Sequence, residues 1–156
     1  MDTAKQPNIF AEAVILSASN FNRNPHVDRK IDVNFKFTYK KKKISDDKGH
    51  GILSVKVTGK NITDNEPVFE LSCSFVGVYR AGSPANMDLD TFLQDFAPAH
   101  LLPYIREYIS SITLRAGIPP ILLPPLNIKA ILKTPEKVEG KATDNTIKEF
   151  QKKLKK

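Results

Sequence analysis

The sequence predicts an α+β domain in which a four-stranded antiparallel sheet packs against one long helix, and two observations support this prediction. Within the first 80 residues, apolar and polar residues alternate along several stretches, which places the apolar side chains on one face of each strand. After residue 88 the apolar spacing changes to three and four residues, the period of a helix. A chain of 156 residues, 40% of them hydrophobic, can bury the core of one such domain.

The clearest strand is expected over residues 30–39, where every second side chain is apolar. Residues 52–58 repeat this alternation. Between the two stretches lie Lys40-Lys41-Lys42-Lys43 and Gly49-His50-Gly51, which are typical of a solvent-exposed turn. We therefore expect an antiparallel hairpin with the lysines at its tip.

Two further strands are expected on either side of this hairpin in the sequence. Residues 69–75 alternate, and a change of apolar phase at Val76 and Val78 indicates either a bulge or burial on both faces. Residues 9–17 form a less regular strand, followed by an expected loop over residues 20–25 that is rich in asparagine. All four strands precede the helical part of the chain.

The helical part begins after Asp88, whose carboxylate can cap a first turn. The main helix is expected to end at Gly117, because glycine readily adopts the backbone conformation that ends helices. Pro98 is compatible with a helix start. Pro103 is expected to kink or restart the helix, because proline removes a backbone donor and crowds the preceding turn.

The segment after this helix combines aliphatic residues with four prolines, Pro119, Pro120, Pro124 and Pro125. The prolines exclude a central strand and break any helix before Leu126, so the segment is expected to be extended. Extended segments normally lie at the surface of a domain. We expect residues 118–128, here called the crossover segment, to form one wall of an apolar groove. The alternative is that they only cover the core or a subunit interface.

The net charge of +7 is concentrated in two places, the Lys40–Lys43 run and residues 133–156. Such runs are usually solvated, but they leave a nucleic-acid or ribosome-surface binder as an alternative, with Phe35, Phe37 and Tyr39 as stacking groups. These aromatic residues alternate with polar ones, so we interpret them as core. No specific nucleic-acid partner is predicted.

The sequence carries no pattern typical of catalysis, metal binding or nucleotide binding. His26, His50 and His100 fall on separate predicted elements, and the single Cys73 cannot complete a zinc site with them. Phosphate-binding glycine loops and the nucleophile elbow of hydrolases are absent from the sequence. We therefore predict no enzymatic activity, no metal and no cofactor.

Residues 1–132 are expected to form the domain, followed by a basic polar tail over residues 133–156 with a short amphipathic helix at 144–154. The N-terminal residues lack the pattern of a secretory signal, and no apolar run approaches the roughly 20 residues that cross a bilayer. A cytoplasmic protein without stable membrane insertion is expected.

Residues 96–128 resemble the SecB family of protein-export chaperones. Two motifs carry the resemblance: Pro103-Tyr104, Arg106-Glu107 and Ile109 in the main helix, and Leu123-Pro124-Pro125-Leu126-Asn127-Ile128 at the end of the crossover segment. The four strands match the family in pattern and order more than in individual residues.

This resemblance implies a homotetramer, a dimer of dimers, that holds unfolded polypeptides in apolar grooves without ATP, either for export or to protect a specific client. By position it assigns client binding to the second strand and the crossover segment: Ile31, Val33, Phe35, Ile118, Ile121, Leu122, Leu123, Leu126 and Ile128. The motif residues Pro103, Tyr104, Arg106, Glu107 and Ile109 are expected to hold the helix in the subunit interface.

Two variants of this function follow from the resemblance. Familiar SecB proteins are acidic and deliver clients to the motor protein SecA, and the basic charge of this chain disfavours SecA as a partner. A SecB-like chaperone that protects an antitoxin is the alternative within the same fold. A protein that uses the apolar surface only for self-association is a further alternative.

Overall fold

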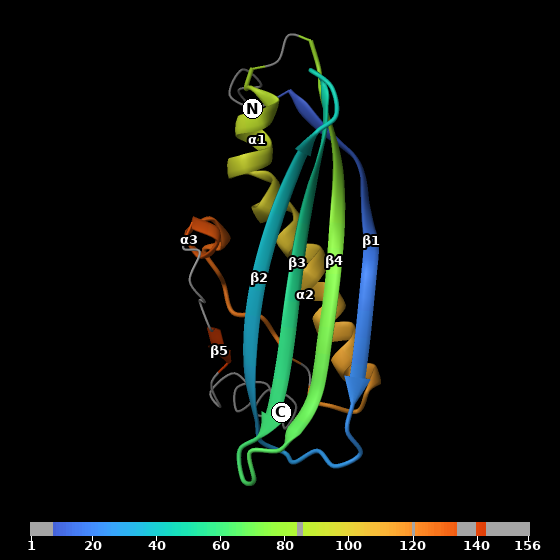
Figure 1. Cartoon of the computed structure of the whole chain (residues 1–156), viewed down its shortest axis with the longest axis vertical. Helices are drawn as coiled ribbons and strands as arrows, with labels where there is room; N and C mark the ends of the chain where they lie inside the picture. Colours follow the sequence, from blue (N-terminus) through green and yellow to red (C-terminus); the bar gives the residue numbers. More distant parts are fainter. Residues whose placement is uncertain (1–7, 84–85, 120, 134–139, 143–156) are drawn as a thin grey trace, which may run out of the picture.

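The computed structural model describes residues 8–83, 86–119, 121–133 and 140–142 (Figure 1). The elements, in chain order, are β1 Ile9–Arg23, β2 Ile31–Lys43, β3 Lys48–Asn61, β4 Pro67–Ala81, α1 Leu89–Asp95, α2 Ala97–Arg115, α3 Ile128–Lys133 and β5 Gly140–Ala142. Among the described residues, no helix is long and apolar enough to cross a membrane.

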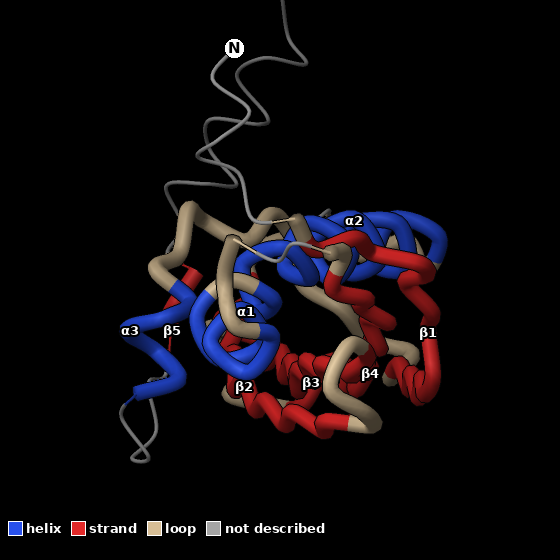
Figure 2. Tube along the Cα trace, turned by 90° about the horizontal axis from the view of Figure 1, so that it is seen from above, coloured by secondary structure: helices blue, strands red, loops and turns tan. Residues whose placement is uncertain are grey.

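The sheet is antiparallel throughout and has the order β1-β4-β3-β2-β5. The α+β prediction of four long strands and one long helix is confirmed. In cross-section the four long strands form an arc, and α1 and α2 lie on its inner side (Figure 2). The predicted alternation holds, because Ile31, Val33 and Phe35 of β2 are buried on the helical side.

The predicted hairpin tip was wrong in position. The four lysines belong to β2 and the Gly49-His50-Gly51 run belongs to β3, with Lys43 opposite Gly49, so the turn lies at residues 44–47. The glycines serve close packing here: a Cβ at Gly51 would lie 2.6 Å from the Tyr39 hydroxyl. A side chain of the neighbouring strand therefore explains the glycine that the sequence indicated as a turn residue.

The strand β1 is also longer than predicted, because Asn20 and Asn22 pair with β4 and are not in a loop. Its register against β4 shifts at Glu12 and Ser17, so the bulges lie in β1. Strand β4 itself has a regular register around Val76 and Val78, which are partly buried on the face away from the helices. Burial on both faces, one of the two explanations of the phase change, is the correct one.

Asp88 caps α1 as predicted, accepting a hydrogen bond from the Thr91 N–H at 3.2 Å. The long helix α2 runs through Pro103 without a restart, so that part of the expectation was wrong, and a kink at Pro103 stays a prediction. Pro103 is exposed, so its ring extends into solvent. Gly117, with φ of 68°, ends the helix as expected.

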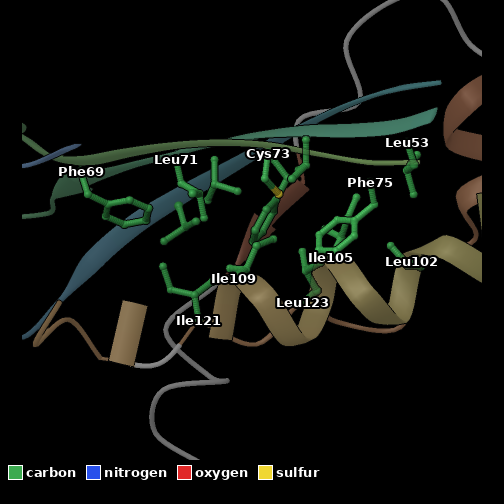
Figure 3. Close-up of a cluster of buried hydrophobic side chains, with 14 of the residues drawn as sticks. Leu53, Phe69, Leu71, Cys73, Phe75, Leu102, Ile105, Ile109, Ile121 and Leu123 are labelled. Carbon is green, nitrogen blue, oxygen red and sulfur yellow. The ribbon is translucent and has the colours of Figure 1, made fainter. Parts of the chain in front are cut away.

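The main core lies between the sheet, α2 and the crossover segment (Figure 3). Strand β5 was not predicted; it extends the sheet beyond β2 by pairing with Val33–Phe35. The division into residues 1–132 and a tail stays a prediction, and the expected helix at 144–154 lies outside the described residues.

Candidate functional site

The crossover segment lies along α2 and contributes alternate side chains to the core. Ile121 and Leu123 point between the helix and the sheet, close to Ile105 and Ile109 of α2 (Figure 3). Leu122, between them, is 37% exposed. The segment therefore has an inner apolar face that is part of the core and an outer apolar face that is accessible.

Most residues assigned to client binding belong to the inner face or to the sheet beneath it. Seven of the nine are buried in the main core: Ile31, Val33, Phe35, Ile118, Ile121, Leu123 and Ile128. Leu126 is partly buried, and Leu122 is exposed. The structure thus brings the predicted residues together, but in this conformation only Leu122 and Leu126 can contact another chain.

A shallow pocket of about 370 Å³ lies between the outer face of α2 and the crossover segment. Its lining residues are Pro103, Arg106, Glu107, Ser110, Ser111, Leu114 and Leu122. Leu114 is 63% exposed, and Phe96 and Tyr104 expose large apolar surface on the same helix or at its start. Leu114 and Leu122 share this pocket, whereas Phe96 and Tyr104 do not line it. The four exposed side chains, Phe96, Tyr104, Leu114 and Leu122, are here together called the outer apolar surface.

Sequence reasoning missed Leu114 and Phe96 as site residues. The inward stripe of α2 consists of Leu101, Ile105 and Ile109, and Leu114 falls outside that spacing. The sequence does contain a signal for Leu114. A large apolar residue outside the buried stripe of a helix is expected to be exposed, and an exposed apolar residue can contact another molecule.

The motif residues expected in a subunit interface divide between two environments. Ile109 is fully buried in the core, whereas Pro103, Arg106 and Glu107 line the pocket. The Tyr104 ring lies 6.2 Å from the Phe75 ring, which ties α2 to β4. The Arg106 Nε atom is buried and has no hydrogen-bond partner among the described residues. Ile109 therefore cannot contact another chain in this conformation, and a subunit-interface role for Pro103, Tyr104, Arg106 and Glu107 stays a prediction.

Few polar contacts hold the crossover segment in place. The Ile121 N–H donates to Thr113 Oγ1 at 3.3 Å, and this is the one hydrogen bond made by residues 121–126. Pro124 and Pro125 have no N–H to donate. The segment is therefore held mainly by side-chain burial.

Three titratable groups within the described part of the chain have a pKa raised by burial. Burial raises the pKa of the Cys73 thiol to about 12, so the thiol is protonated and a poor nucleophile. Burial also raises the pKa of Tyr39 and Tyr79, whose hydroxyls contact the Leu93 carbonyl and His100 Nδ1, respectively. These groups serve packing and hydrogen bonding.

One cluster that the sequence did not reveal joins two loops. Ligand atoms of His26, Asp28 and Asp64 lie within 4.8 Å of one another. His26 and Asp64 are exposed, His26 Nε2 pairs with Asp28 at 3.1 Å, and Thr63 donates to the other Asp28 oxygen. The cluster is explained as a polar link between the β1–β2 loop and the β3–β4 turn.

The aromatic residues considered as nucleic-acid stacking groups face the core. Phe35 is buried, and Phe37 and Tyr39 pack against buried residues. Their interpretation as core residues is confirmed.

Comparison with known proteins gives a consistent result. The family model described as preprotein translocase subunit SecB matches residues 9–138. The protein-export protein SecB of Neisseria meningitidis serogroup A is 32% identical over 141 residues, covering 90% of this chain and 84% of that protein. The SecB of Thiobacillus denitrificans is 32% identical over 88 residues, or 56% of this chain. The chain spans little more than half of that relative, 57% of its length.

Among solved structures, the chain is similar to a SecB-like chaperone of Mycobacterium tuberculosis determined in complex with an antitoxin peptide. The TM-score is 0.66 at 16% identity, with 77% of this chain and 91% of that chain covered. This likeness supports the fold.

Proposed function

Because the chain belongs to the SecB family, whose family model matches residues 9–138, we propose that it is an ATP-independent cytoplasmic chaperone. It holds unfolded polypeptides and carries out no covalent step. The observation that supports this proposal is the outer apolar surface, which is exposed along α2 and the crossover segment.

The chemistry of this surface suits a binder of many sequences. Phe96, Tyr104, Leu114 and Leu122 offer aromatic and aliphatic groups that gain free energy from any apolar side chain, at roughly 25 cal/mol per Å² of buried area. Such contacts demand no single client sequence. A client therefore needs only an extended apolar stretch.

We propose that the buried residues assigned to client binding contact a client when the crossover segment is displaced. One hydrogen bond joins residues 121–126 to α2, so a client can replace Ile121 and Leu123 by offering equivalent apolar side chains. Its displacement would uncover Ile31, Val33 and Phe35 of β2. This conformational step is how the residues assigned from the family would reach a client.

Assembly as a homotetramer is part of this proposal. Phe10, Ile15 and Leu16 of β1 are large apolar residues exposed on the first strand of the sheet, which has no neighbour on its outer side among the described strands. Burying them against a second copy would remove an exposed apolar edge.

Proteins awaiting export are the proposed clients, because the relatives from N. meningitidis and T. denitrificans are protein-export proteins. An antitoxin is the second candidate, since the similar M. tuberculosis chaperone was solved with an antitoxin peptide. The basic charge disfavours SecA as the partner that receives the client.

The test is suppression of aggregation of a urea-unfolded, slowly folding preprotein by the full chain without nucleotide. Leu114→Asp and Leu122→Asp should each reduce suppression severalfold, because a buried carboxylate opposes apolar contact. Ile44→Asp, in the exposed β2–β3 turn, is the matched control and should retain suppression. Absence of suppression by the unmodified chain would overturn the proposal.

A further inference from the structure

One face of the sheet is covered by α1 and α2, and no described helix covers the opposite face, here called the open face (Figure 1). The side chains of β2 alternate between these faces, with Val33 and Phe35 on the helical side. Lys36, Lys40 and Lys42 therefore lie on the open face. Lys60 of β3 also lies on the open face. It is opposite Asp32 in the backbone register of β2 and β3, and the Asp32 side chain points away from the helices because that of Val33 points toward them.

These four lysines are exposed, and none forms an ion pair with another described residue. Neighbouring cations on the same face are neutralised. Lys56 pairs with Glu70 at 3.3 Å and Lys48 with Glu12 at 3.7 Å. The open face therefore carries positive charge without ion-pair partners at Lys36, Lys40 and Lys42 of β2, and Asp32, opposite Lys60, is the one acidic side chain that β2 contributes to this face.

The lysine run of β2 is divided by the alternation of the strand. Lys41 points to the helical side and pairs with Asp90 of α1 at 2.9 Å, and Lys43 lies 3.9 Å from Asp46. Lys40 and Lys42 alternate with Lys41 and Lys43 along β2 and point to the open face. On the helical side, Lys41 thus has a close acidic partner and Lys43 a distant, exposed one, whereas Lys40 and Lys42 on the open face have none among the described residues.

A shallow depression of about 390 Å³ lies on the open face beside these lysines. Lys36 and Lys56 flank it, and Thr38, Ser54 and Ser74 line it, with the two serine hydroxyls 2.7 Å apart. Small hydroxyl side chains allow a backbone to approach closely, and ammonium and hydroxyl groups both donate to carboxylates.

We propose that the open face docks an acidic polypeptide segment of another protein. Charge complementarity with Lys36, Lys40 and Lys42 identifies the partner as acidic. A single-stranded nucleic acid is disfavoured, because base stacking needs exposed aromatic groups and the aromatic residues of β2 pack on the helical side. The surface is separate from the outer apolar surface, which belongs to α2 and the crossover segment.

The test compares two double variants that remove the same charge from opposite faces of one strand. Lys40→Gln/Lys42→Gln alters the open face, and Lys41→Gln/Lys43→Gln alters the helical side. The probe is a short fluorescein-labelled peptide of alternating Glu and Ser, measured by anisotropy at low salt with the full chain. The first variant should weaken binding about fivefold and the second less than twofold.

Several outcomes would overturn this inference. These are no binding of the acidic peptide, equal weakening in both variants, or equal binding of a peptide with Gln in place of Glu. Tighter binding of an oligouridylate or of anionic phosphatidylglycerol vesicles, with the same sensitivity to Lys40→Gln/Lys42→Gln, would assign the face to another partner class. Aggregation suppression should be unchanged in both variants, so failure here is distinguishable from failure of the chaperone proposal.

Discussion

Thr113 of α2 accepts a hydrogen bond through Oγ1 from the backbone N–H of Ile121, at 3.3 Å, in a fully buried position. The same hydroxyl donates to the Ile109 carbonyl at 2.8 Å. This side chain therefore connects the last turns of the helix to the crossover segment. It makes the one hydrogen bond of residues 121–126, and this bond adds to the side-chain burial that mainly holds the segment.

Thr113→Val should destabilise the fold by about 1–3 kcal/mol, because it preserves shape but leaves the buried Ile121 N–H without an acceptor. Urea denaturation followed by circular dichroism measures this. Thr58→Val, in β3, is the control and should change stability much less. Unchanged stability of Thr113→Val would show that the hydrogen bond does not hold the segment.

Neighbouring leucines of the crossover segment should respond differently to truncation. Leu123→Ala removes a side chain that is 5% exposed and should cost about 2–5 kcal/mol of unfolding free energy. Leu122→Ala should cost less than about 1 kcal/mol, because that side chain lies on the outer face. Equal costs would contradict the alternation of inner and outer faces.

The stability contributed by the neutral Cys73 thiol should decline at alkaline pH. Burial raises its pKa from 9.0 to about 12, so above pH 9 the unfolded chain releases a proton that the folded chain keeps. The contribution is complete below pH 9 and is lost as the pH rises toward 12.

The unfolding free energy of the wild type relative to Cys73→Ala should therefore fall by about 1 kcal/mol between pH 8 and pH 10. Urea denaturation of both proteins at the two pH values measures the difference. A constant difference would place the thiol in contact with water.

Replacing Pro103 by alanine should stabilise the protein by about 1–3 kcal/mol, because it restores a helical N–H in the interior of α2. Thermal unfolding should show a higher midpoint. Pro98→Ala, at the helix start where no donor is needed, should give no such gain. A midpoint that Pro103→Ala leaves unchanged would mean that the helix already accommodates the proline without cost.

Local patterns predicted most of the fold. The alternation that buries Ile31, Val33 and Phe35 and the cap at Asp88 depend on neighbours in sequence, and both are confirmed. The ends of the hairpin strands were wrong, because Gly51 is explained by the Tyr39 side chain of the paired strand. Contacts of that kind depend on the tertiary arrangement. Glycine is favoured both in a turn and in a strand that a neighbouring side chain approaches closely, so the residue type alone does not distinguish the two.

The site was predictable in its location more than in its accessibility. Proline content and apolar composition identified the crossover segment as extended and as part of an apolar surface. They could not show that Ile121 and Leu123 fill the space between the sheet and α2. A segment that packs into the core and a segment that lines an open groove both require apolar residues. Leu114 was missed, since attention to the helical stripe selects the buried face.

Contact between a client and the outer apolar surface tests the chaperone proposal most directly. A benzophenone probe is attached to Leu122→Cys, with the buried Cys73 replaced by alanine, and irradiated with a urea-unfolded preprotein after dilution. Cross-linking to the client should be strong at position 122 and weak for the same probe at Ile44→Cys, which is comparably exposed in the β2–β3 turn. Equal cross-linking at the two positions, or none at position 122, would contradict the proposal that this surface holds clients.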